Sequence, residues 1–124
     1  AAYTCTPLVQ FPIDDIKPGA KIKGKTVAEL GNMNRPLDMI AYRKDGKSFL
    51  LMANSARGVM KISTDDIARS EGITSQIPGT AGQAYETIAS LVGVTQLDRL
   101  NEEHAVVMTQ AEGTPAALKT VPLP

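Results

Sequence analysis

The sequence predicts an all-β protein in which four-stranded antiparallel sheets recur along the chain. Residues 14–16 (Asp-Asp-Ile) return 51 positions later as residues 65–67, and residues 25–30 resemble residues 86–91. A recurrence at roughly 50 to 60 residues is typical of stacked units, such as propeller blades, that bury their apolar faces against one another. The chain of 124 residues is long enough for one domain but too short for a whole propeller, which needs about 4 to 8 blades.

The first half of the chain is expected to hold five strands separated by turn-forming Gly, Pro, Asn and Asp residues. Their ranges are 2–13, 21–30, 37–42, 48–53 and 59–63. Residues 48–53 are nearly all apolar, which indicates a strand buried on both faces. Residues 59–63 alternate between apolar and polar, which indicates an outer, half-exposed strand.

A tight hairpin is expected at Asp45-Gly46, because this dipeptide supplies the positive φ values that two-residue hairpin loops need. Further along, residues 72–82 are expected to form a loop. Residues 85–92 have helical propensity, but their likeness to residues 25–30 favours a strand. Three more strands complete the pattern; their ranges are 94–100, 104–109 and 117–123.

These strands divide the chain into repeating units. Residues 1–20 are the end of one unit, residues 21–70 form a complete unit, residues 71–86 are an inserted connection and residues 87–124 form a second complete unit. Each complete unit is expected to be a four-stranded antiparallel blade, so the chain holds about two and a half blades. Insertions between stacked repeats often map to a binding face, although a plain surface connection is the alternative here.

Bulk properties exclude several classes of function. The chain has 13 basic and 13 acidic residues, so it lacks the electrostatic footprint of a nucleic-acid-binding protein. No apolar run approaches the length of a transmembrane helix. A disulfide within the chain is impossible because Cys5 is the single cysteine. In a secreted protein Cys5 could pair with another chain; the alternative is a small buried apolar residue. Ala1 in place of Met predicts proteolytic processing.

Residues 35–55 resemble a blade of the YVTN-type seven-bladed β-propellers. In that family a Pro opens the inner strand, an Asp-Gly-Lys hairpin follows and the next strand ends in Ala-Asn; here these are Pro36, residues 45–47 and residues 53–54. The resemblance implies a periplasmic or extracellular protein, since relatives include secreted surface proteins and propeller subunits of periplasmic amine dehydrogenases. It implies a position for ligands, at the loops or the central channel, rather than a chemistry.

Four residues are candidates for a ligand or channel site, because they flank the inner strands of the complete first unit: Arg35, Asp38, Asn54 and Arg57. An arginine there could hold a carboxylate or phosphate through two hydrogen bonds. The alternative is an Asp38–Arg interaction or turn bonding that fixes the blade. Asp38 recurs as Asp98 at the same repeat position, which favours a structural role.

No catalytic or metal-binding residues are predicted, and no cofactor is evident in this chain. His104 is the single histidine and Cys5 the single cysteine, so a zinc site within the chain is not expected. The acidic pairs at residues 14–15 and 65–66 could suit calcium. They are more readily explained as turn residues that accept nearby backbone N–H groups.

The sequence therefore predicts a non-catalytic scaffold or binding portion of an exported β-propeller, completed by a second chain or by further copies of this one. Two alternatives stay open. The completed propeller could be a subunit of a periplasmic or extracellular oxidoreductase complex whose catalytic groups lie elsewhere. The chain could also be a small autonomous β-sandwich.

Overall fold

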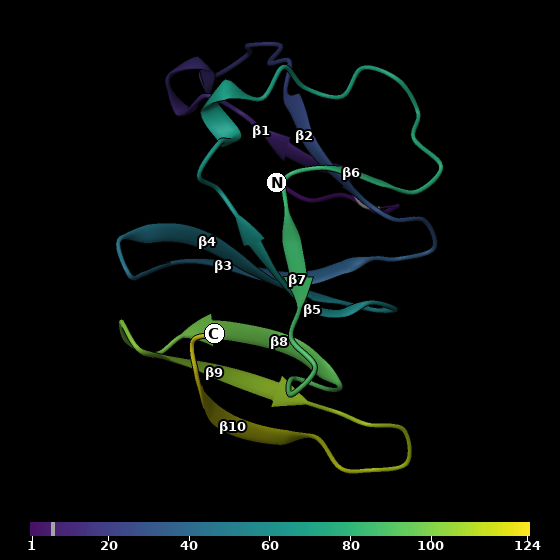
Figure 1. Cartoon of the computed structure of the whole chain (residues 1–124), viewed down its shortest axis with the longest axis vertical. Coiled ribbons are helices and arrows are strands. Elements are labelled where there is room, and N and C mark those ends of the chain that lie inside the picture. Colours follow the sequence, from purple (N-terminus) through teal and green to yellow (C-terminus); the bar gives the residue numbers. More distant parts are fainter. Residues whose placement is uncertain (6) are drawn as a thin grey trace.

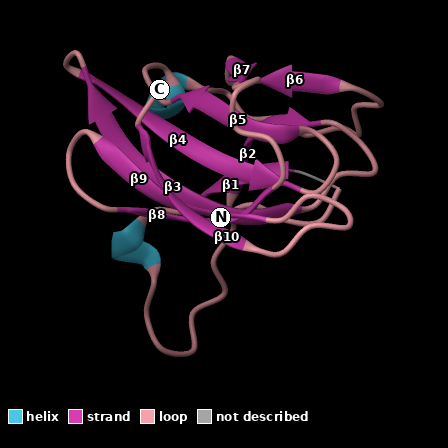
Figure 2. Ribbon diagram, turned by 90° about the horizontal axis from the view of Figure 1, so that it is seen from below, coloured by secondary structure: helices cyan, strands magenta, loops and turns pink. Residues whose placement is uncertain are grey.

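The computed structural model describes residues 1–5 and 7–124 and is all-β. In this part of the chain, ten strands form three antiparallel sheets that are not closed into a ring. Figure 1 shows the sheets as successive layers along the long axis. In Figure 2 the layers overlap when the molecule is turned by 90°, with short helical turns at the periphery. The expected fold class is thus confirmed at the level of stacked antiparallel sheets.

Sheet A contains β1 (Pro7–Gln10), β2 (Lys25–Leu30) and β6 (Thr80–Gly82). A single antiparallel bridge joins Ala2 to Leu8 at the edge of β1. The 3-10 helix η1 (Ile13–Asp15) follows β1. Sheet A therefore assembles the start of the chain with a strand from the inserted connection.

Sheet B is the middle layer and has the strand order β3-β4-β5-β7. The bounds are β3 (Pro36–Lys44), β4 (Lys47–Asn54), β5 (Gly58–Ser63) and β7 (Tyr85–Thr87). The 3-10 helix η2 (Ile67–Arg69) lies between β5 and β6 in the sequence. Sheet C contains β8 (Val94–Arg99), β9 (His104–Thr109) and β10 (Ala117–Pro122), with β9 in the middle.

The predicted hairpin and the doubly buried strand are both confirmed. Asp45 and Gly46 have φ values of 51° and 76°, as expected for the turn between β3 and β4. Along β4, Leu51 and Ala53 pack toward sheet C, whereas Leu50 and Met52 pack toward sheet A. This alternation follows from the two-residue period of a strand.

Two expectations about strands are wrong, and a third holds only in part. β5 is not half-exposed: Val59, Met60 and Ile62 are at most 1% exposed, because sheets A and C cover its faces and β7 covers its edge. The region expected as a loop contains β6, which pairs with β2. Residues 85–92 form a strand only as far as Thr87.

The repeat units also divide between sheets differently from the prediction. The strand that opens the unit 21–70, β2, pairs with β1 in sheet A and not with β3. Likewise β7 pairs with β5, so sheet C has three strands and not four. For β2 the reason is connectivity, because it pairs with β1, the strand that it follows in the sequence, before the chain crosses to the next layer.

Two apolar clusters hold the three layers together. One lies between sheets A and B, and the other lies between sheets B and C. The buried members of the first are Leu8, Val27, Ala28, Leu30, Met52, Met60 and Ile62. Those of the second are Tyr42, Leu51, Ala53, Val59, Leu91, Val94, Leu97, Ala105, Val107 and Leu123.

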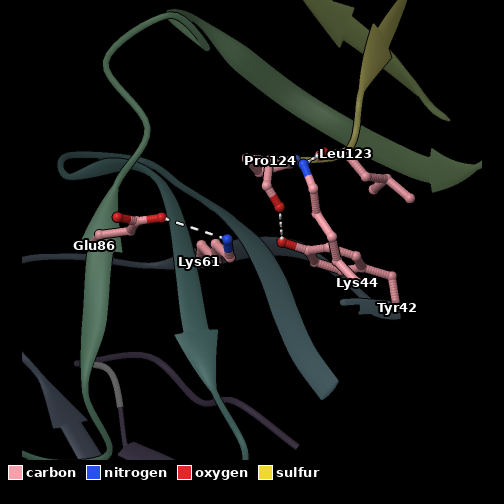
Figure 3. A network of polar contacts seen from close by, with 6 residues as sticks. All are labelled: Tyr42, Lys44, Lys61, Glu86, Leu123 and Pro124. Atoms are coloured by element: carbon pink, nitrogen blue, oxygen red, sulfur yellow. Dashed lines mark hydrogen bonds and ion pairs between the residues drawn. The ribbon is translucent and has the colours of Figure 1, made fainter. Parts of the chain in front are cut away.

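Polar contacts fasten the end of the chain to sheet B (Figure 3). The Tyr42 hydroxyl donates to the Pro124 carbonyl at 2.7 Å, and Lys44 Nζ donates to the Leu123 carbonyl at 2.8 Å. Burial raises the pKa of Tyr42 to about 12, and the nearby Glu86 carboxylate adds to this rise. The phenol therefore stays protonated and able to donate at neutral pH.

Candidate functional site

The predicted site residues gather where β3 and β4 meet the adjoining loops, but they do not form one pocket. Asn54 and Arg57 line a groove between the ends of sheets B and C. Asp38 lines a different groove, together with β8 and the outward side of sheet C. Arg35 is exposed and lines neither groove. The structure thus separates the four residues into three local settings.

Asn54 is part of a buried amide pair rather than an open ligand site. Its Oδ1 accepts from Asn34 Nδ2 at 2.9 Å, and its own Nδ2 donates to the carbonyls of Met52 and Gly58 at 3.2 Å. Asn34 is 1% exposed, and its Oδ1 accepts the N–H of Ala56. The pair therefore fixes the turn between β4 and β5 against the loop that precedes β3.

The two arginines flank this amide pair. The backbone of Arg35 exchanges hydrogen bonds with Ser55: Arg35 N–H donates to Ser55 Oγ, and Ser55 N–H donates to the Arg35 carbonyl, both at 2.9 Å. The guanidinium of Arg57 lies so close to Gly31 that a Cβ at that position would overlap it. Gly31 has φ of 98°, a conformation that glycine adopts without strain.

Asp38 joins sheet B to sheet C. Its Oδ1 accepts the N–H of the next residue, Met39, and its Oδ2 accepts the N–H of Leu97 in β8, both at 2.9 Å. Neither ion pair found within the described residues involves Asp38. The Asp38 carboxylate therefore links the two sheets through backbone N–H groups, and the described residues show no ion pair between Asp38 and an arginine.

Asp98 repeats half of this arrangement. Its Oδ1 accepts the N–H of the next residue, Arg99, at 2.7 Å, as Asp38 does with Met39. Asp98 is exposed and lies opposite Val106, on the side of sheet C that faces away from sheet B. We call this side the outer face of sheet C; its residues are Gln96, Asp98, Val106, Met108, Leu118 and Thr120.

The outer face is the main feature that the sequence reasoning did not single out. A signal for it exists in β9, where residues 105–108 are all apolar. Ala105 and Val107 pack on sheet B, while Val106 and Met108 point the other way and are half-buried. A strand that is apolar on both faces is expected to be covered on both faces, as β4 is.

Cys5 is exposed, so the expectation of a small buried apolar residue is wrong. Its backbone N–H donates to the Asn34 carbonyl at 3.2 Å, and its φ is 66°. These contacts place Cys5 beside the loop that holds the buried amide pair. Pairing of Cys5 with another chain stays a prediction.

The other chemistry-bearing residues lie apart. In the ranges 1–5 and 7–124, no three His, Cys, Asp or Glu side chains are arranged to hold a metal ion. Asp66 forms an ion pair with Arg69, and neither 3-10 helix is capped by a side chain, so the expected turn capping by the acidic pairs is not found at these helices. His104 begins β9, and its backbone N–H donates to Asn101 Oδ1 at 2.8 Å.

Comparisons of the chain with protein-family models, with curated proteins and with solved structures found no match. Among the described residues, none of the helices is long and apolar enough to cross a membrane.

Proposed function

We propose that these residues are a non-catalytic part of an exported β-propeller, acting as a scaffold or binding surface, with its remaining sheets on another chain or another copy. The observation that carries the proposal is the outer face of sheet C. Sheet B is covered on both faces by neighbouring sheets, whereas sheet C is covered on one. Leu118, on the uncovered side, is 71% exposed.

The strand registers support a blade-like repeat. Three pairs of opposite residues in sheet A have counterparts in sheet B at the two offsets seen in the sequence, 51 and 61 residues. The matched pairs are Ala2–Leu8 with Ala53–Val59, Val9–Thr26 with Met60–Thr87, and Gln10–Lys25 with Lys61–Glu86. Matching registers are expected of successive units that share one backbone plan.

The exposed surface area supports the same proposal. The chain exposes 8010 Å², whereas a compact monomer of 13.2 kDa is expected to expose about 6400 Å². The excess fits a stack with an unfilled end. Propellers close into a ring of about 4 to 8 blades, so three sheets need further sheets to reach closure.

Native mass spectrometry of the assembly purified from its source tests the proposal. We expect a mass well above 13.2 kDa that includes a second sheet-forming chain or further copies. A folded monomer of 13.2 kDa would contradict it, and so would one longer polypeptide that carries all the sheets itself. A visible absorption band from haem or a quinone in the assembly would favour the oxidoreductase alternative.

A further inference from the structure

We propose that the outer face of sheet C docks the first strand of a further antiparallel sheet on a partner chain, and that Asp98 accepts a backbone N–H from that strand. This inference rests on the proposed function and names the element that the partner must present. The template for the contact is within the molecule, at the interface between sheets B and C.

At that interface one carboxylate serves two strands. Asp38 Oδ1 accepts the N–H of Met39, which leaves Oδ2 to accept the N–H of Leu97 in sheet C. Hydrogen bonds to a charged acceptor are about twice as strong as neutral ones. Asp38 thereby fixes where β8 lies along β3, while the apolar residues around it provide the contact area.

Asp98 has the same local geometry 60 residues later. Its Oδ1 is held by the N–H of Arg99 at 2.7 Å. In sheet B, Asp38 lies in a row with Ala53 and Val59; in sheet C, Asp98 lies in a row with Val106 and Thr120. Both rows lie on the side that faces away from sheet A, and only the first is covered.

The chemistry of the face specifies the occupant. Val106 lies opposite Asp98, and Met108 and Leu118 lie in the next row of the same face. This apolar surface beside the carboxylate favours a partner that is itself apolar. Covering a carboxylate with an apolar sheet is costly unless a donor meets it. An apolar strand whose backbone N–H meets Asp98 as the Leu97 N–H meets Asp38 provides both the apolar contact and the donor.

A second copy of this chain fits less well. Within the described residues of sheet A, the bridge at Ala2 lies next to β1 on the side away from β2. No described strand of sheet A corresponds to β8 of sheet C. Docking by the described residues of sheet A of another copy would therefore not supply the N–H. Docking by the outer face of another copy would bring two Asp98 carboxylates to one interface, and like charges disfavour this.

The test uses the full chain extended by a tethered second copy of residues 88–124, which carries the donor strand known to fit Asp38. The first measurement compares Asp98→Ala in the extended chain and in the original chain. We expect the substitution to lower the Tm of the extended chain by about 5 °C and that of the original chain by much less. An equal loss of Tm in both chains would mean that Asp98 bonds only to Arg99 and accepts nothing from the added strand, and this would overturn the proposal.

A second measurement reads coverage of the outer face directly, without a substitution at Asp98. Leu118→Cys, in a Cys5→Ser background, reports access to the outer face through its rate of thiol labelling. We expect labelling to be at least tenfold slower in the extended chain. An unchanged rate would overturn the proposal.

Sedimentation of the original chain separates this inference from the proposed function. A dimer that Leu118→Asp abolishes would assign the face to a second copy and overturn the choice of a partner chain, while leaving the proposed assembly intact. The expected result is a monomeric original chain, together with a covered outer face in the extended chain. If the source assembly proves to be a lone 13.2 kDa chain, the proposed function fails whatever the tethered chain shows.

Discussion

Asp38 and Asp98 occupy the same repeat position but have different surroundings. Asp38 is half-buried and bonds to two backbone N–H groups, one of them in the next sheet. Asp98 is exposed and bonds to the neighbouring Arg99. The energetic value of the position therefore depends on whether a sheet covers it.

We expect Asp38→Ala to lower the free energy of unfolding by about 2–3 kcal/mol, because it leaves the Leu97 N–H without its charged acceptor. The matched control, Asp98→Ala, should change it by less than about 0.5 kcal/mol in the isolated chain. Urea titration followed by circular dichroism measures both. Equal losses would show that Asp38 does not join the sheets.

The buried amide pair supports a second prediction at this scale. Asn34→Ala should lower the free energy of unfolding by about 1–3 kcal/mol, since Asn54 Oδ1 loses its donor in a buried setting. The exposed neighbour Asn32, which donates to the Pro78 carbonyl at 3.1 Å, supplies a control. If Asn32→Ala costs as much as Asn34→Ala, the amide pair does not organise this loop.

The raised pKa of Tyr42 leads to a prediction of how the free energy of unfolding changes at alkaline pH. Burial raises its pKa from 10.0 to about 12, so the unfolded chain loses the phenol proton at a lower pH than the folded chain. The contribution of Tyr42 is therefore complete below pH 10 and falls as the pH rises from 10 to about 12. Tyr42→Phe should show a smaller loss of stability over this range. Parallel curves for the two proteins would contradict the assignment.

At the scale of elements, β6 shows how the inserted connection is anchored. Gly82 has φ of 84°, and a Cβ there would overlap the backbone of Val27 in β2. We expect Gly82→Ala to detach β6 from β2, because alanine meets both strain and overlap. Hydrogen exchange should show lost protection in sheet A with sheet C unchanged. Unaltered protection in β2 would contradict this account.

Some elements could be predicted from the sequence and others could not. The Asp45-Gly46 hairpin and the doubly buried β4 have local signals, namely a turn dipeptide and an apolar run. The placement of β2 in sheet A has no such signal, since a repeat shows the order of strands but not the sheet that a connecting strand joins. β6 is three residues long, too short for a period to be seen.

The candidate site was predictable to a similar degree. The recurrence of Asp38 as Asp98 was visible and its structural role followed from it. The burial of Asn34 was not, because it depends on contacts with a turn 20 residues away. The same holds for Arg57 and Gly31, which meet only once the sheets have stacked.

The whole molecule is a stack with one well-covered layer in the middle. Sheet B contributes to both apolar clusters, so its strands should be the last to unfold. Sheet C is held through a single apolar cluster, the hydrogen bond from Leu97 N–H to Asp38, and the contacts of Tyr42 and Lys44 with the chain end. A partner would therefore bury most additional apolar surface by covering the outer face of sheet C.

Methionine oxidation tests that central claim most directly, with peroxide treatment of the isolated chain and of the assembly from its source. Met108 lies on the outer face, Met33 is 91% exposed on a loop, and Met52 is fully buried. We predict that assembly slows the oxidation of Met108 severalfold, while Met33 reacts equally and Met52 stays protected in both. Equal oxidation of Met108 in the two samples would show that nothing covers the outer face and would contradict the account.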